Sequence, residues 1–430
     1  MKINMRIEIY TQTYKKRMVT LLSICTFVCA GILGRSASAD TDLNKVIESL
    51  YGGDGITLTI SGGFNHAAHF TSASLNEFAQ LSRAAQDSAV TTSSGGGGTE
   101  FVYDEITGEF TSVANAQGGV FTEHAGTLGK GRLNLGASYT YTKYTHYNGQ
   151  SLNGVRLTLA HVDLAEPNIC IGGPAGACYE FERDYIQVDT EIDLTNHVLA
   201  LYGSYGITDK LDFGVLVPII HTRLIAKANA TFIENETKQF FPGTIHSFDP
   251  AVDPTYSTAD GEYTSVGDFS LRAKYALYSG DQTQLASVLE VRFPTGDANN
   301  LQGIDYYGAK PMLLASRSFP FETFGFGLHA NVGYEFNAGY LGQDEFDYVV
   351  GAEYYRQFTN DRMLSLSIEA IGSHELTRKD GSGDHTTDLA FGLRLKTAKD
   401  LFIEYGMKYA LDKHGIRASR VHQLALKMNL

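Results

Sequence analysis

The chain has 430 residues, with 45 Gly, 25 Tyr and 24 Phe but no Trp, and charged residues make up only 19% of it. Its formal net charge of −14 excludes a protein that binds nucleic acid through the phosphates. Abundant Gly, Tyr and Phe with few charges favour strands and turns, so the length suits several soluble domains or one large β-barrel.

Residues 1–39 have the form of a secretory signal peptide. A basic stretch at 15–17 precedes an apolar run, and an Ala-Ser-Ala tripeptide ends at Ala39. The run is shorter than the roughly 20 apolar residues of a spanning helix, so an uncleaved anchor is the weaker alternative. We predict an exported protein that is cleaved after Ala39.

Residues 40–128 differ in character from everything that follows them. Short helices are expected at 43–50 and 73–89, and the sequence SSGGGG at 93–98 is a flexible break. Gly-rich, weakly apolar sequence suits packing against a polar barrel wall. We expect a plug, or hatch, inside a barrel; an extension into the periplasm is the alternative.

From residue 129 to 430, apolar and polar side chains alternate with a period of two. In residues 322–336, Phe324, Phe326 and Leu328 begin an entirely apolar face, and the positions between them are small or polar. Short turns alternate with longer loops, as in bacterial outer-membrane barrels, whereas a soluble sandwich is the alternative. We predict an all-β fold, a transmembrane antiparallel β-barrel of 12 to 14 strands. Fourteen is the estimate, with single strands at 151–163 and 263–278 among them, and twelve results if 183–207 is one long strand.

Two cysteines of the exported chain, Cys170 and Cys178, enclose a Gly-rich loop. In an exported protein this spacing favours a disulfide. Metal binding is the weaker alternative because no paired His stands nearby.

Charged side chains on the polar faces of these strands are candidates for lining the lumen. An Arg or Lys that faces lipid at mid-depth costs about 2 to 4 kcal/mol, so alternation places such groups inside. They form either a polar conduit with a dock for the plug, or ion pairs that only fill space. The predicted lumen-lining residues are Asp189, Glu191, Arg272, Lys274, Glu290, Arg292, Glu369, Asp388, Arg394, Glu404 and Lys408.

The longest predicted loop, residues 228–262, carries several aromatic side chains. Long loops with apolar residues on a rigid scaffold are often functional, so this loop is a candidate substrate-entry surface. A lid that only packs over the barrel mouth is the alternative. The aromatic residues are Phe232, Phe240, Phe241, Phe248 and Tyr256.

Other motifs do not predict a cofactor, a metal or an enzyme. The sequence GTLGKGRL at 126–133 lacks Ser or Thr after its Lys and precedes a strand, unlike a phosphate loop. His66 and His69 lack a third ligand. The sequence DGSGD at 380–384 begins like a calcium loop, but Phe391 stands where the closing carboxylate belongs. No G-x-S-x-G or H-E-x-x-H motif occurs.

Three segments carry a family resemblance: YGITDKLDFGVLVPI at 205–219, SVGDFSLRAKYALY at 265–278 and VLEVRFPTGD at 288–297. They resemble outer-membrane β-barrel proteins of the phenol meta-pathway degradation type, relatives of the long-chain fatty acid and aromatic hydrocarbon transporters. The resemblance covers about residues 120–430, including an entry into the first strand at 121–141. The Asn-Pro-Ala of the fatty acid transporters' hatch is missing from 40–130, so their gating mechanism does not carry over.

The resemblance implies a channel for passive uptake of hydrophobic or amphipathic small molecules, with an N-terminal hatch. We expect a location in the bacterial outer membrane, contact with its lipid, and insertion by the barrel-assembly machinery. A structural or general-diffusion, porin-like barrel with a fixed plug is the first alternative. The second is an outer-membrane hydrolase with Ser and His on adjacent strands.

Overall fold

The structure is a computed structural model, and it describes the chain in separate ranges. The predicted signal peptide, the helix predicted at 73–89, both cysteines, Phe240 and Phe241 lie outside them. The described residues are 42–46, 50, 58–60, 100–103, 110–113, 119–160, 185–233, 246–248, 256–338, 344–359, 362–376, 385–398 and 401–429.

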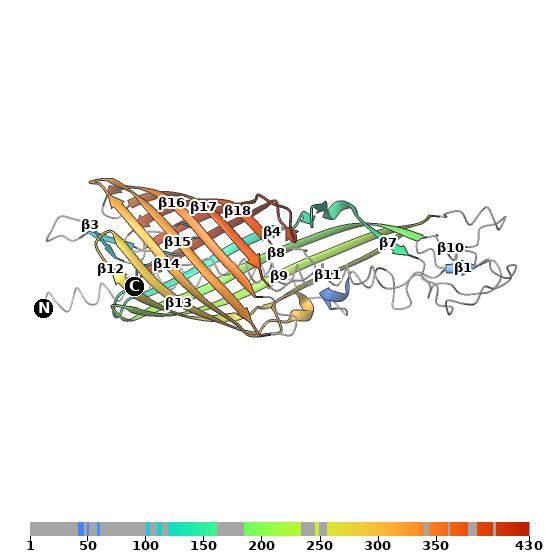
Figure 1. Ribbon diagram of the computed structural model, residues 1–430, viewed down its shortest axis with the longest axis horizontal. Helices are drawn as coiled ribbons and strands as arrows, with labels where there is room; N and C mark the ends of the chain where they lie inside the picture. Colours follow the sequence, from blue (N-terminus) through green and yellow to red (C-terminus); the bar gives the residue numbers. More distant parts are fainter. Residues whose placement is uncertain are drawn as a thin grey trace.

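Twelve of the described strands close into one antiparallel barrel, because the last of them pairs with the first (Figure 1). The predicted all-β fold is confirmed. In order around the ring, the strands are β4 (Leu133–Lys143), β8 (Tyr185–Thr208), β9 (Leu211–Ile233), β12 (Phe269–Ser279), β13 (Thr283–Phe293), β14 (Gly308–Pro320), β15 (Phe324–Asn337), β16 (Glu345–Thr359), β17 (Arg362–Glu375), β18 (His385–Ala398), β19 (Leu401–Ala410) and β21 (Arg420–Asn429).

β8 and β9 are much longer than the other strands and continue past the closed ring. Their outer halves pair with β7 (Val155–Ala160) and β11 (Tyr256–Val266) in a small sheet that projects from one end of the barrel (Figure 1). This explains the strand number: 183–207 is one strand, and the strand predicted at 151–163 lies outside the ring. The strand predicted at 263–278 is divided between β11 and β12.

Short connections lie at the opposite end of the barrel. Residues 209–210 join β8 to β9, and 280–282 join β12 to β13. Outer-membrane barrels carry short turns on the periplasmic side and long loops outside. We therefore call this the periplasmic end, and we call the projecting sheet the extracellular mouth.

Smaller elements complete the described structure. No described helix has the length and apolar character needed to cross a membrane. The elements are the short helices η1 (Leu43–Lys45), η3 (Leu152–Gly154) and η5 (Ala298–Asn300), and the short strands β1 (Leu58–Ile60), β2 (Glu100–Tyr103), β3 (Phe110–Val113), β5 (His146–Tyr147), β6 (Gln150–Ser151), β10 (His246–Phe248) and β20 (Ile416–Arg417).

Around the ring, alternate side chains point outward and are apolar. Leu289, Leu313 and Leu328 are about half exposed, at 49%, 56% and 52%, whereas Glu369 and Arg394 are buried inside at 1% and 2%. A closed barrel satisfies every backbone hydrogen bond of its strands, so an apolar outer band is stable in lipid. The ring has the exterior of a membrane-spanning barrel and a charged interior.

The break between β11 and β12 is filled by the Pro-Thr-Gly-Asp loop that follows β13. The Asp268 carboxylate accepts hydrogen bonds from the N–H groups of Gly296 and Ile304, both at 2.8 Å. The Thr295 hydroxyl donates to the Gly267 carbonyl at 2.9 Å. The Gly-Asp and Pro-Thr-Gly-Asp motifs of the family resemblance therefore hold each other in place.

Candidate functional site

A ten-residue stretch ahead of the first barrel strand, residues 119–128, lies inside the barrel near its periplasmic end. We call it the luminal segment. Its backbone and side chains contact inward-facing residues of β9, β12, β14, β17 and β18. These strands stand on different sides of the ring, so the luminal segment crosses the lumen.

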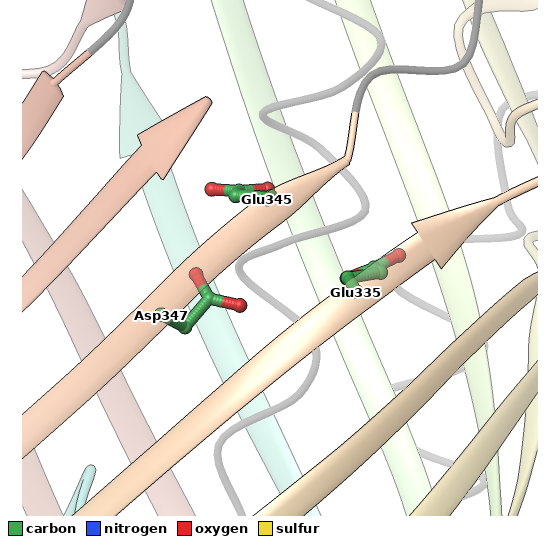
Figure 2. A group of neighbouring side chains, drawn as sticks. All are labelled: Glu335, Glu345 and Asp347. Atoms are coloured by element: carbon green, nitrogen blue, oxygen red, sulfur yellow. The ribbon is translucent and has the colours of Figure 1, made fainter. Parts of the chain in front are cut away.

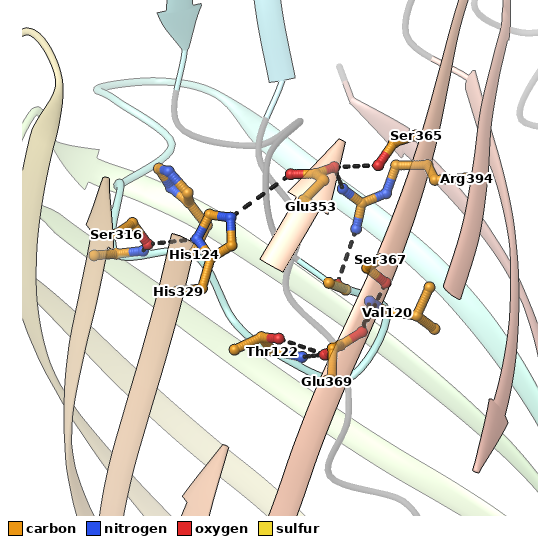
Figure 3. Close-up of polar contacts among 12 residues, drawn as sticks. Val120, Thr122, His124, Ser316, His329, Glu353, Ser365, Ser367, Glu369 and Arg394 are labelled. Carbon is orange, nitrogen blue, oxygen red and sulfur yellow. Dashed lines mark hydrogen bonds and ion pairs between the residues drawn. The ribbon is translucent and has the colours of Figure 1, made fainter. Parts of the chain in front are cut away.

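One end of the luminal segment is bound by a single carboxylate, that of Glu369 (Figure 3). Its oxygens accept hydrogen bonds from the N–H groups of Val120 at 2.7 Å, Phe121 at 3.1 Å and Thr122 at 2.5 Å, and from the Thr122 hydroxyl. A Cβ at Gly119 would lie 2.1 Å from Cδ of Glu369. Only glycine lets the chain approach the carboxylate this closely.

The middle of the luminal segment is bound by charge. Glu123 forms ion pairs with Arg272 and with Lys274, the latter at 3.2 Å. Lys274 also donates to the His124 carbonyl at 2.6 Å, and Arg272 contacts Glu290 at 3.0 Å. Burial alone would raise the pKa of Glu123, but the two cations outweigh it and the pKa is lowered. Glu123 is therefore a carboxylate when docked.

Ser316, His329 and Glu353 lie in series beside the luminal segment (Figure 3). The Ser316 Oγ lies 2.9 Å from His329 Nδ1, and His329 Nε2 lies 3.6 Å from Glu353. These are the residue types of an acyl-hydrolase triad. However, the Ser316 hydroxyl already accepts the Ala125 N–H at 3.0 Å, and Ser316 and His329 are only 3% and 2% exposed. A docked segment leaves no access for a substrate. We therefore assign the three residues to the inner wall that binds the luminal segment, which we call the dock.

His124 lies within this dock as a neutral ring. Its ring meets that of His329 edge to face at 5.4 Å, and its Nδ1 accepts the Gly126 N–H at 2.9 Å. Burial lowers the pKa of His124 well below its ordinary value, and His329, Lys274 and Arg394 act in the same direction.

A buried ion-pair network continues along the wall behind the luminal segment. Arg394 bonds to Glu404 at 2.6 Å, contacts Glu353 at 3.6 Å, and donates to the Gly119 carbonyl at 3.1 Å. Lys427 contacts Glu404 at 2.7 Å. Buried charges of both signs are thus paired, and one of them also holds the segment.

A cavity of about 150 Å³ adjoins the luminal segment inside the barrel. Charged, neutral polar and apolar side chains share its wall, among them Phe121, Arg272, Lys310, Tyr348 and Lys408. The wall of this cavity therefore offers both apolar surface and hydrogen-bonding groups.

Three carboxylates that sequence analysis did not select, Glu335, Glu345 and Asp347, gather on β15 and β16 in the same lumen (Figure 2). Their oxygens lie within 4.8 Å of one another, as in a metal site. However, Arg292 contacts Glu335 at 2.8 Å, and Lys310 bonds to Asp347 and lies 3.6 Å from Glu335. Two cations already offset this charge, so we assign the cluster to the ion-paired wall.

Most of the predicted lumen-lining residues face inward. They are Arg272, Lys274, Glu290, Arg292, Glu369, Asp388, Arg394, Glu404 and Lys408.

For Asp189 and Glu191 the lumen prediction is wrong. Asp189 pairs with Arg156 at 2.8 Å, and the Asp189 and Glu191 side chains are 42% and 64% exposed, whereas Val188 and Ile192 of the opposite face are buried. Both acids lie in the extracellular mouth. There the outer face meets water, so the charged face points outward.

The predicted entry loop at 228–262 is partly strand. β9 extends to Ile233, and β11 begins at Tyr256, which is 60% exposed. The rings of Phe232 and Phe248 pack edge to face at 5.8 Å. Of the described aromatic residues in this range, Tyr256 is available at the surface, while Phe232 and Phe248 pack against the interior of the mouth.

In a comparison with protein families, residues 186–415 match the family described as "Putative MetA-pathway of phenol degradation". The match spans more than half of the chain. The chain belongs to this family. A comparison with curated proteins found no match.

Solved outer-membrane proteins are distantly similar to this family member. An outer membrane channel from Pseudomonas putida F1 is 13% identical, with a TM-score of 0.40, and the alignment covers 71% of this chain and 98% of that one. A mutant of the monoaromatic hydrocarbon channel TodX is 12% identical, with a TM-score of 0.30 and coverage of 71% and 91%. The NanC porin is 12% identical, with a TM-score of 0.31 and coverage of 55% and 94%. Similarities this low do not indicate a shared function.

The family and the architecture together fix where this protein resides. A closed antiparallel ring with an apolar exterior, short turns at one end and a charged lumen is the form of a bacterial outer-membrane barrel. The protein is located in the outer membrane of a bacterium, in contact with its lipid.

Proposed function

We propose that the protein is an outer-membrane channel for passive uptake of hydrophobic or amphipathic small molecules, and that residues 40–128 are its hatch. The observation that carries the proposal is the docking of the luminal segment. Charged side chains line the interior of the ring, and hydrogen bonds and ion pairs that join two parts of the chain hold the segment across it. Such contacts can be exchanged for water when the segment leaves.

The substrate class follows from the family and from the lumen. The family description names a pathway of phenol degradation, which supports aromatic or otherwise hydrophobic substrates. The cavity beside the luminal segment has mixed polar and apolar walls. A molecule of one ring with a polar group suits such a wall better than a long alkane does, because the alkane would leave charged groups desolvated and unpaired.

Uptake into proteoliposomes tests this function. Full-length exported protein should admit a labelled aromatic solute faster than protein-free liposomes do, and deletion of residues 40–128, which removes the whole luminal segment, should raise the rate further. A structural barrel, or a general-diffusion barrel with a fixed plug, predicts no selectivity for aromatic over equally sized sugar solutes. Absence of any permeability, even after the deletion, would refute the channel.

A further inference from the structure

The interior of the extracellular mouth has the opposite character to the lumen of the ring. The inner faces of β8 and β9 carry buried apolar side chains there, and residues from the loops complete the same cluster. Water surrounds this part of the molecule, and only the inner face of each strand is apolar. The cluster comprises Leu43, Val46, Leu50, Tyr144, Leu152, Val155, Ile186, Val188, Ile192, Leu194, Leu224, Ala226, Ala228, Ala230, Leu301 and Ile416.

Three of these side chains come from the distant N-terminal part of the chain: Leu43, Val46 and Leu50. We call residues 42–46 together with Leu50 the latch. Leu43 packs on β11, where a Cβ at Gly261 would lie 2.6 Å from Cδ2 of Leu43. The Leu43 N–H donates to Asn300 Oδ1 at 3.2 Å. Asn44 Nδ2 donates to Asn299 Oδ1 at 3.3 Å, and the apolar side chains of the latch cover the inner surface of the mouth.

A row of neutral polar side chains crosses the same inner face one layer below the apolar cluster. Thr142 pairs with Asn196 in the strand register, and Asn196 pairs with Thr222. Gln302 donates through Nε2 to the Thr222 hydroxyl at 2.9 Å and to the Asn300 carbonyl at 2.8 Å. The row therefore adjoins the latch through Asn300.

Several atoms of this row have no hydrogen-bond partner among the described residues. They are Oγ1 of Thr142, Oδ1 of Asn196 and Oε1 of Gln302, and the three residues are at most 1% exposed. A buried acceptor without a partner destabilises the folded state, so such atoms are rare in proteins unless something else binds them. A ligand that carries a hydrogen-bond donor would satisfy an amide oxygen of this row.

We propose that the apolar mouth and the polar row form a binding site for an uncharged, apolar small molecule that carries a hydroxyl group, and that the latch occupies this site until the ligand displaces it. The apolar body of the ligand takes the place of Leu43, Val46 and Leu50. Its hydroxyl donates to Asn196 Oδ1. A charged ligand is excluded because the walls are apolar and the row is neutral.

This site deepens the proposed function, on which it rests, since it names the substrate class and the first point of contact outside the membrane. It also couples binding of the ligand to release of the hatch. Residues 42–50 and the luminal segment belong to the same N-terminal stretch, so release of the latch frees one end of the hatch when a suitable molecule arrives.

A single-tryptophan reporter tests the site directly. The natural chain has no Trp, so Leu50→Trp gives full-length protein in nanodiscs one indole, buried in the mouth. Two probes are titrated, 4-butylphenol and its methyl ether 4-butylanisole, which share the ring and the butyl chain. The ether carries a methyl group in place of the hydroxyl hydrogen, so it lacks the donor. We expect 4-butylphenol to shift the emission to the red and to raise quenching by acrylamide, with an apparent Kd about tenfold lower than that of the ether.

The Asn196→Leu variant, made in the reporter background, separates recognition from folding. It removes an unpartnered buried acceptor together with a long contact, at 3.4 Å, from Asn196 Nδ2 to the Tyr144 hydroxyl. These changes oppose each other, so its unfolding temperature should change little, while the tenfold preference for the hydroxyl falls toward one. Gln284→Leu is the matched control, because Gln284 also carries an unpartnered buried Oε1 but lies beside the periplasmic turn. It should retain the full preference.

Two results would overturn the inference. One is no emission shift with either probe, and the other is the same affinity for 4-butylphenol in the reporter protein and in its Asn196→Leu variant. Solute uptake by the same preparations is measured in parallel. Uptake without a latch response refutes the site and leaves the channel intact, whereas a hydroxyl-dependent latch response without uptake supports the site and refutes the channel.

Discussion

β8 and β9 pass through two regions whose polarity is reversed. In the membrane ring, Tyr205 and Ile207 of β8 face outward at 49% and 47% exposure, and the inner wall carries paired charges. In the extracellular mouth, Ile186 and Val188 of the same strand are fully buried inside, and Asp189 lies outside in contact with Arg156. Lipid outside the ring demands an apolar exterior, and water outside the mouth demands a polar one.

The two regions also hold the N-terminal part of the chain by different forces. The luminal segment is bound inside the ring by hydrogen bonds and ion pairs, whereas the latch is bound in the mouth by apolar packing. The hatch therefore has a polar attachment below and an apolar attachment above. Substitutions that remove polar groups should release the luminal segment, and substitutions that change the shape of the mouth should release the latch.

Loss of the Glu369 carboxylate should have the largest effect. Glu369→Ala removes the acceptor of three N–H groups and one hydroxyl of the luminal segment. We expect docking to weaken by about 3 to 5 kcal/mol, as when one partner of a buried charged contact is removed. Proteoliposomes with the variant should swell faster in a small neutral solute than those with the natural protein.

Glu191→Ala is the matched control for Glu369→Ala. It removes the same chemical group from the outer face of the mouth, where the side chain is 64% exposed, and it should leave swelling unchanged. If both variants behave like the natural protein, the luminal segment stays in place without Glu369, and the polar attachment is not what closes the lumen.

The reversal of polarity can be tested with one cation placed on two outer faces. Leu313→Arg puts the charge in the apolar band of the ring, where Leu313 is 56% exposed. We expect a loss of about 2 to 4 kcal/mol in the free energy of unfolding from phosphatidylcholine vesicles. Thr231→Arg puts it on the exposed outer face of the mouth, opposite Gln187 in the strand register, where a change within about 0.5 kcal/mol is expected. Equal losses would mean that lipid surrounds the mouth as well.

Period-two alternation predicted the ring well because lipid lies outside every strand there. The apolar side chains therefore point outward in all of these strands. It placed Glu290 and Arg292 in the lumen, as the structure does. The same alternation in β8 continues beyond the lipid, and nothing in the pattern marks where the solvent outside changes. Asp189 and Glu191 were therefore assigned to the wrong face.

The dock was beyond prediction for a different reason. Glu369 was selected as a charge in the lumen, but its partner Val120 is 249 positions away in sequence. Backbone N–H groups carry no sequence signal, so the residues that bind to Glu369 could not be named. The Glu335, Glu345 and Asp347 cluster left a partial signal, since Glu335 is one of the polar positions in 322–336, but alternation alone does not show which charges meet.

A smaller effect is expected from a change of shape in the mouth. Gly261→Val adds atoms where Leu43 packs, since even a Cβ there would lie 2.6 Å from Leu43. Overpacking of this kind costs about 1 to 3 kcal/mol, and it should release the latch and redden the emission of a Trp at position 50. Gly154→Val, where nothing lies within 4 Å of the added Cβ, should leave the emission unchanged. Identical emission from both would show that the latch can shift without leaving.

The smallest effect is expected from protonation of His124. Burial lowers the pKa of His124 well below its ordinary value, and His329, Lys274 and Arg394 add to the shift. The undocked segment therefore binds a proton more readily than the docked one. Docking is complete above the ordinary value of about 6.5 and weakens as the pH falls below it. Swelling should rise on going from about pH 7.5 to about pH 5. His124→Gln keeps an acceptor for the Gly126 N–H but cannot be protonated, so it should lose this rise. A rise of the same size in the variant would place the proton on another group of the dock.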